Sequence, residues 1–310
     1  MNTTTSADKV ISPFEGLRAL IGDLSSAFSA IRSKRNDAQK RLNDVIEAIR
    51  YFTEHQPDAT LGAIHLSREE SPLKQPLYCG VLADLLAEKL DYSVDARNKL
   101  LMATLCSNIS FIEFQVLLNS MDGSLSQEQR DKLRRHPEDG AQLLEEAGIG
   151  NSHVIEVVRQ HHERIDGTGY PRQLKGGEIL TDALIVSLTD FYTAMIDNRA
   201  YRSSTHATDA LRKMYEKASI REKPLQLNLV KAVGVFPPGT FVKLNSGEIA
   251  LVIKRQLNTP IPIVRAIIDP AGKPYLGGLP RDCSQEKYKV KCAHYLEKRP
   301  PMDLTKLFEL

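Results

Sequence analysis

The sequence predicts a mainly α-helical protein with an N-terminal helical extension and a small C-terminal β unit. Apolar residues recur every three or four positions over most of the first 235 residues, which is the period of an amphipathic helix. After Phe236-Pro237-Pro238-Gly239 the period changes to two, as in half-buried strands. We therefore divide the chain into an N-terminal helical region over 1–64, a helical domain over 65–235, and a β unit with a tail over 236–310.

Composition narrows the class of protein. A chain of 310 residues can bury a sizeable core. Its 41 Lys and Arg nearly balance 39 Asp and Glu, so we expect no nucleic acid polymer and no membrane as partner. The four cysteines lack paired ligand spacing and are typical of reduced thiols. No run of 18 apolar residues occurs, and the start MNTTTSADK lacks the layout of a signal peptide. These features predict a soluble, cytoplasmic protein.

The N-terminal region carries an apolar seam that begins after a helix start at Ser12-Pro13. It predicts one long helix or two helices in line, with a break near Ser33–Asn36 because Arg35 falls on the seam. Two interpretations stay open: the seam packs onto the chain's own core, which we favour, or it forms a homodimer through the N-terminal helices. The seam residues are Phe14, Leu17, Ile21, Leu24, Phe28, Ile31, Ala38, Leu42, Val45, Ile49 and Phe52.

Further helices are expected along the middle of the chain, after a polar, turn-rich connector over His55–Pro72. A short helix before Gly148 has a helix-ending glycine, and the segment around Asp190 is strongly apolar. The expected helices cover 77–90, 96–105, 127–135, 140–146, 154–160, 181–196 and 208–218.

The C-terminal segment predicts strands. Phe241–Leu244 and Ile249–Ile253 flank Asn245-Ser246-Gly247, which is a hairpin signal. Ile263–Ile268 predicts a further strand followed by a turn, and Leu304–Leu310 a short docked helix.

The most informative stretch is His161-His162-Glu163-Arg164-Ile165-Asp166-Gly167-Thr168-Gly169-Tyr170-Pro171. Two histidines at the polar end of a short apolar helix point about 100° apart, so both can reach one cleft. Gly167, Gly169 and Pro171 force a turn whose backbone N–H groups become free to meet an anion. A histidine pair alone is most often an ordinary surface or core feature, but the whole string is more specific.

This string resembles the signature of the HD-GYP family, metal-dependent phosphodiesterases that hydrolyse cyclic di-GMP. The resemblance extends roughly over 61–282 and implies an HD-superfamily helical bundle with a centre of two or three iron or manganese ions. It implies metal-ligand roles for His136, His161, His162 and Asp190. It implies ligand-binding roles for Asp166, Gly167, Gly169, Tyr170, Arg172, Lys175 and Arg199.

The chain departs from the family where the namesake His-Asp dyad belongs. The family string Leu-His-Asp-Ile-Gly-Lys falls at Cys106-Ser107-Asn108-Ile109-Ser110-Phe111. Ser107 replaces the histidine ligand, Asn108 replaces the bridging aspartate, and Phe111 replaces the lysine. A further upstream histidine of the family falls near Gln75. We therefore expect no catalytic residue at these degenerate positions.

The loss changes the expected chemistry. Two dications about 3.5–4 Å apart need an anionic bridge, and Asn108 carries no charge. Serine is a poor ligand because its hydroxyl keeps its proton. One divalent metal, iron or manganese, could still bind the four remaining ligands. We leave open whether that remnant site is structural, weakly catalytic or empty.

Three functions follow. The favoured one is a degenerate HD-GYP protein that binds cyclic di-GMP, or a partner such as a GGDEF-domain diguanylate cyclase, without hydrolysis. The alternative is an active metal-dependent cyclic di-GMP phosphodiesterase with a rebuilt or single-metal site. The third is a purely structural interaction module that uses the N-terminal seam.

Overall fold

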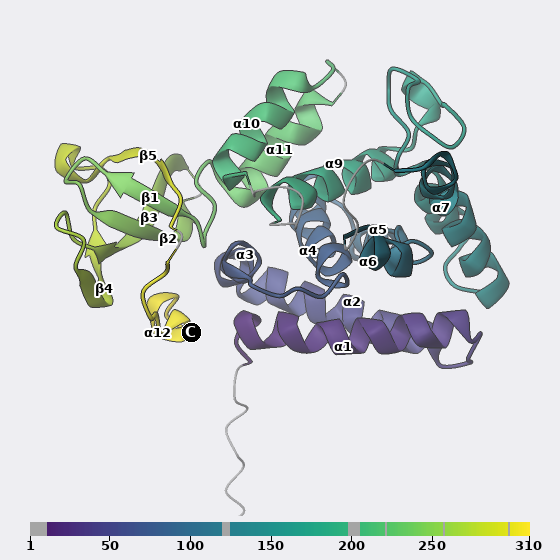
Figure 1. The fold of residues 1–310 in the computed structure, drawn as a ribbon, viewed down its shortest axis with the longest axis horizontal. Helices are drawn as coiled ribbons and strands as arrows, with labels where there is room; N and C mark the ends of the chain where they lie inside the picture. Colours follow the sequence, from purple (N-terminus) through teal and green to yellow (C-terminus); the bar gives the residue numbers. More distant parts are fainter. Residues whose placement is uncertain (1–10, 120–124, 198–204, 221, 257, 297) are drawn as a thin grey trace, which may run out of the picture.

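The structure is a computed structural model that describes residues 11–119, 125–197, 205–220, 222–256, 258–296 and 298–310. Figure 1 shows a helical body with the β unit attached at one end. The predicted fold class is confirmed: helices dominate, and the strands form one small antiparallel sheet near the C-terminus. None of the helices in the described ranges is both long and apolar enough to cross a bilayer.

The N-terminal seam folds back on itself. Helices α1 (Pro13–Arg32) and α2 (Ala38–His55) pack side by side, so the expected break is present but the helices are not in line. The side chain of Ser12 caps α1 by accepting from the backbone N–H of Phe14. Phe28 is only 2% exposed and Leu42 is fully buried, so the seam packs on the chain's own core. Because these apolar side chains are already covered within one chain, their burial favours the first interpretation over a dimer through the seam.

The rest of the body surrounds α4, a helix buried on nearly every side. It packs against α2, α5, α9 and α11, and this arrangement brings residues far apart in the sequence into one core. The helices after α2 are α3 (Pro57–Leu66), α4 (Lys74–Lys89), α5 (Val94–Cys106), α6 (Ile112–Asn119), α7 (Gln127–Ala147), α8 (Ser152–Gln160), α9 (Thr181–Ile196), α10 (Ala207–Lys217) and α11 (Lys223–Val233).

Two helix predictions need correction. The expected connector over His55–Pro72 contains α3, which starts with a proline in its first turn and buries Leu61 and Ile64. The two helices expected around Pro137 are one continuous α7, which ends at Gly148 with φ 66°. Helices α6 and α11 were not predicted.

The β unit is a five-stranded sheet in the order β4-β3-β2-β1-β5. The predicted hairpin and third strand are confirmed, and β4 and β5 are additional. Apolar residues of the sheet pack with Leu66 of α3 and Leu307 of the tail, and Arg255 forms an ion pair of 2.6 Å with Asp58. The sheet is therefore docked on the helical body. Its elements are β1 (Phe241–Leu244), β2 (Ile249–Gln256), β3 (Thr259–Ile268), β4 (Pro274–Arg281) and β5 (Val290–His294), followed by α12 (Leu304–Leu307).

Candidate metal centre

Three histidines meet where α7 packs against α8. His136 lies within α7, while His161 and His162 follow the last residue of α8. Their ligand nitrogens all lie within 4.8 Å of one another, and Nε2 of His136 is 3.2 Å from Nε2 of His161. His136 and His161 are buried and His162 is half-buried. The structure thus brings together three of the four expected metal ligands.

The backbone fixes the tautomers of two of these rings. Pro137 has no N–H, so the carbonyl of Leu133 lacks its usual helical donor, and Nδ1 of His136 donates to it over 2.6 Å. Nδ1 of His161 likewise donates to the carbonyl of Val158 over 2.7 Å. Because both protons are held on Nδ1, the two Nε2 atoms face each other with bare lone pairs. Metal-binding histidines are typically oriented by hydrogen bonds of this kind.

The surroundings disfavour a proton between the rings. Burial, followed by the charge of a neighbouring imidazole, lowers the pKa of His136 and of His162 to about 3. The same causes hold the pKa of His161 well below its usual value. Neutral imidazoles with converging lone pairs fit a divalent cation, so the residues present suit one metal ion.

The segment over Cys106–Phe111 reaches this cluster through its last residue. Ser107 is buried, and its hydroxyl donates to the carbonyl of Thr104 over 2.9 Å, within its own helix. The ring of Phe111 lies 4.9 Å from that of His136. Phe111, which occupies the position of the family's lysine, therefore lies next to the histidines.

Asp190, the fourth expected ligand, faces two amides. Nε2 of Gln75 donates to Oδ1 of Asp190 over 2.6 Å, and Nδ2 of Asn108 lies 3.5 Å from the same oxygen. Asp190 lies outside the group of three histidines that could share one ion. No carboxylate belongs to that group among the described residues, so the three histidines alone offer no anionic bridge for two adjacent metal ions.

The glycine turn is held together internally. The buried carboxylate of Glu163 accepts from the backbone N–H groups of Arg172 (2.6 Å) and Leu174 (3.0 Å). Asp166 accepts from both the N–H and the hydroxyl of Thr168. The expectation that this turn offers free N–H groups to an anion is therefore wrong for these donors. The turn needs glycine because a Cβ on Gly169 would lie 2.3 Å from the backbone nitrogen of Arg164.

The other expected ligand-binding residues lie on or near this turn. The ring of Tyr170 lies 4.9 Å from that of His162, and burial together with the charge of Asp190 raises the pKa of Tyr170. The guanidinium of Arg172 pairs with Glu156, and Lys175 bridges to Asp166 through the backbone. Gly167 adopts φ 77° against the side chain of Lys175. Arg199 lies outside the described residues.

A cavity of about 270 Å³ opens beside the histidines, between the turn and helices α9, α10 and α11. His162 and Asp190 line one side, and Lys217 and Glu222 line another. Sequence reasoning missed Lys217 and the buried Glu163. The amphipathic pattern of α10 was visible, but nothing local indicated that one of its cations would line the same cavity as His162.

Comparison with known proteins agrees with this geometry. The family described as HD domain matches residues 63–221, slightly more than half of the chain. The chain belongs to the HD-domain family. The HD-domain match contains the three histidines, Asp190, Ser107 and Asn108.

Several curated relatives are similar over part of their length. A cyclic di-GMP phosphodiesterase of Pseudomonas aeruginosa is 28% identical over 79% of this chain and 64% of its own length. The cyclic di-GMP phosphodiesterase response regulator RpfG of Xanthomonas campestris is 30% identical over 43% of this chain and 36% of its own. This HD-domain chain thus spans less than two thirds of either relative.

A solved structure shares the fold. An HDG"Y"P protein from Bdellovibrio bacteriovorus superposes with a TM-score of 0.57 at 18% identity, over 73% of this chain and 75% of that one. The HD-type helical arrangement is therefore shown for this chain.

Proposed function

We propose that this HD-domain protein acts in cyclic di-GMP signalling by binding the nucleotide or a protein partner, rather than by hydrolysing the nucleotide. The observation that carries the proposal is the pair of amides, Gln75 and Asn108, directed at the carboxylate of Asp190. An amide donor satisfies that carboxylate without a metal ion. The position that would need a bridging anion carries a neutral side chain instead.

The chemistry of hydrolysis explains why this matters. Two adjacent dications activate a hydroxide and stabilise the leaving oxygen of a phosphodiester. A single ion held by three imidazoles supplies a Lewis acid but lacks the second ion of that clamp. The relatives are named for cyclic di-GMP, which supports this nucleotide as the ligand.

The alternative is a phosphodiesterase with a rebuilt or single-metal site. It is supported by the converging Nε2 atoms of His136 and His161, 3.2 Å apart, and by the names of the relatives. In that case His162, which lines the cavity, would contact the substrate, and Tyr170 would support the His162 ring from 4.9 Å.

A GGDEF-domain protein as partner remains part of the proposal. The exposed surface of the glycine turn, with Arg172 and Lys175, is the surface we assign to it. A homodimer would have to use a surface other than the N-terminal seam. We also propose a cytoplasmic location, which the four free cysteines support.

Binding and turnover can be separated on one preparation. Calorimetry with cyclic di-GMP measures binding, and chromatography of the nucleotide after incubation with iron(II) or manganese(II) measures hydrolysis. We expect binding without turnover. A matched pair of variants is His162→Ala at the site and His55→Ala on the exposed surface of α2. Turnover that is lost in His162→Ala and kept in His55→Ala would establish the alternative. Absence of both binding and turnover would leave only a protein partner.

A further inference from the structure

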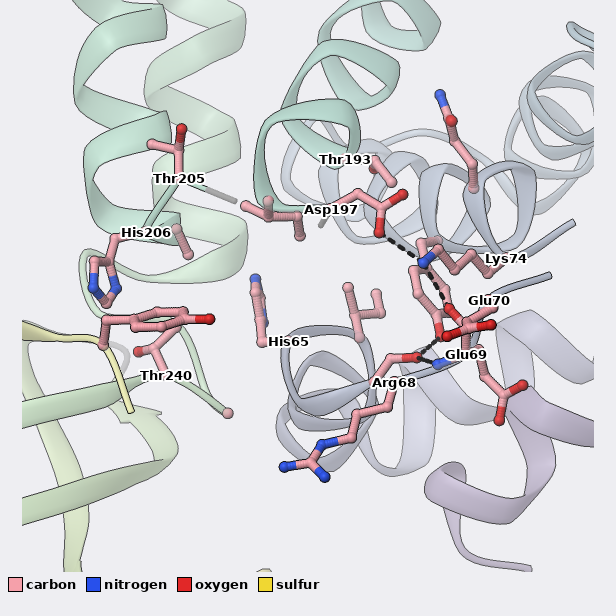
Figure 2. Close-up of a pocket in the computed structure, with 18 of the residues that line it drawn as sticks. His65, Arg68, Glu69, Glu70, Lys74, Thr193, Asp197, Thr205, His206 and Thr240 are labelled. Atoms are coloured by element: carbon pink, nitrogen blue, oxygen red, sulfur yellow. Dashed lines mark hydrogen bonds and ion pairs between the residues drawn. The ribbon is translucent and has the colours of Figure 1, made fainter. Parts of the chain in front are cut away.

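A second, larger cleft lies between the helical body and the β unit. Its volume is about 970 Å³, and none of the three histidines of the metal centre lines it. Its walls come from the end of α3 and the segment leading to α4, the end of α9, the start of α10, and strands β1 and β5 (Figure 2). This volume suits a small organic ligand.

Two arginines line the cleft without an ion-pair partner among the described residues: Arg68 and Arg299. Arg299 is held in place, since its Nη1 donates to the carbonyl of Leu66 over 2.7 Å and its guanidinium lies 5.5 Å from the ring centre of Phe241. Burial, and then the positive charge of Arg68, lower the pKa of Arg299. Two cations thus line one cleft, and neither has an ion-pair partner in the described part of the chain, which favours an anion there.

Three carboxylates line the cleft: two form ion pairs, and Figure 2 shows the third, Glu70, on the Lys74 side. Glu69 pairs with Arg18 over 2.6 Å, and Asp197 pairs with Lys74 over 2.7 Å. Figure 2 shows the side chain of Arg68 extending away from the Lys74 side of the cleft. The part of the cleft that Arg68 faces therefore keeps an excess of positive charge.

An aromatic side chain stands beside these cations. Tyr295, just after β5, is 59% exposed although it lines the cleft, and its ring lies edge to face with His206 at 6.0 Å. An exposed ring of this kind offers a flat face on which a planar base can stack.

We propose that this cleft binds a phosphate-bearing nucleotide, with the phosphate between Arg68 and Arg299 and the base against Tyr295. The site is separate from the three histidines and does not depend on the function proposed for them. Arginine is suited to the phosphate because its guanidinium can donate two parallel hydrogen bonds. The ring of Tyr295 adds affinity for the base of a nucleotide. Inorganic phosphate compounds have no base and gain nothing from it.

Calorimetry on the full chain tests this assignment. GMP is the nucleotide probe, and pyrophosphate is the probe without a base. Arg68→Gln is the main variant, because Arg68 is exposed and its loss does not threaten folding. Tyr295→Ala removes the stacking face. Arg41→Gln, on α2, is the matched control, and a His161→Ala, His162→Ala double variant reports binding at the metal centre.

We expect Arg68→Gln and Tyr295→Ala each to weaken GMP binding about tenfold or more. Arg41→Gln should bind as the parent does, and pyrophosphate should bind more weakly than GMP. The proposal is overturned if the parent does not bind GMP at millimolar concentration, or if Arg68→Gln leaves the affinity unchanged. Equal affinity for pyrophosphate and GMP would overturn the assignment of a nucleotide.

Discussion

The amide nitrogen of Gln75 lies 2.6 Å from Oδ1 of Asp190, although the two residues are 115 positions apart in the sequence. Asn108 approaches the same oxygen from α5's end. Both amides stand where the family resemblance implies a metal ligand. A carboxylate that a metal would otherwise neutralise is thus hydrogen-bonded by neutral donors, and this contact is compatible with a stable site lacking a second ion.

The first prediction concerns metal stoichiometry. We expect protein purified without oxygen and saturated with iron(II) or manganese(II) to hold no more than one ion per chain, because three imidazoles converge and no carboxylate bridges them. Elemental analysis after desalting measures the ratio. His161→Ala should lose the ion, while His55→Ala, on the exposed surface, should keep it. Two ions per chain in the parent would contradict this expectation and restore two-metal chemistry as the favoured mechanism.

Much of the site could be predicted from the sequence, because most of its residues lie in short sequence motifs. The alignment of Asn108 with the family's aspartate is one example, since its amide lies 3.5 Å from Oδ1 of Asp190, another position of the resemblance. The backbone N–H groups that follow the turn are not free for an anion, because a buried carboxylate accepts from them. Glu163 is buried and takes the N–H groups of Arg172 and Leu174. Nothing in the local pattern distinguishes this glutamate from an exposed one.

The connector over 55–72 shows a similar limit. Its polar and turn-forming residues predict a loop, yet Pro57–Leu66 is helical. A Cβ on Gly62 would lie 2.4 Å from the ring of Phe308, so the C-terminal tail packs directly on this helix. Tertiary packing from a segment some 240 residues away decides the conformation, and a window of neighbouring residues cannot report it.

The second prediction concerns the N-terminal seam. Phe28→Glu places a carboxylate where the parent side chain is 2% exposed, and we expect a loss of several kcal/mol of stability. The variant should unfold rather than become a folded monomer, because the seam packs inside one chain. Circular dichroism and light scattering distinguish the outcomes. Ser29→Glu, one position away on the exposed face of α1, is the control and should remain folded. A folded Phe28→Glu protein of half the parent's mass would favour the dimer instead.

The third prediction concerns pH. Nδ1 of His65 donates to the carbonyls of Leu61 and Pro238, and Nε2 accepts from the hydroxyl of Tyr192 over 2.8 Å. Burial lowers the pKa of His65 to about 4 in the folded protein. The unfolded chain therefore binds a proton that the folded chain does not. Stability should fall as pH drops below the unfolded value of about 6.5, and the loss should level off below the folded value.

The contribution of His65 is measured by comparing variants in urea at pH 7 and pH 5. A pKa shift of about two and a half units lowers the free energy of unfolding by about 3 kcal/mol once the pH is well below the folded-state pKa. Between pH 7 and pH 5 we therefore expect a loss of roughly 2 kcal/mol. His65→Asn keeps a donor towards the carbonyls but does not titrate, so its pH dependence should be smaller by that amount. His55→Asn is matched, because His55 also bonds the carbonyl four residues before it but is exposed. Equal pH dependence in His65→Asn and the parent would refute the assignment.

The last prediction concerns repair of the degenerate site. Asn108→Asp alone adds a carboxylate beside Asp190, and we expect it to lower the melting temperature in a chelating buffer, because like charges repel. Added manganese(II) should reverse the loss, since an ion that binds only the folded state stabilises it by about 2.7 kcal/mol at a hundred times its Kd. Gln75→His and Ser107→His, combined with Asn108→Asp, should raise the metal content from one ion per chain towards two.

A control variant shows whether a change in melting temperature comes from the site or from the added charge alone. Asn43→Asp adds the same charge to the exposed face of α2, so manganese(II) should not change its melting temperature. Activity need not return with the metal, because Phe111 packs 4.9 Å from His136 where the family carries a lysine. Metal content is therefore the decisive measurement. A triple variant that binds no more metal than the parent would show that these three positions do not converge on the histidines as ligands, and that the amides around Asp190 are packing rather than the trace of a metal centre.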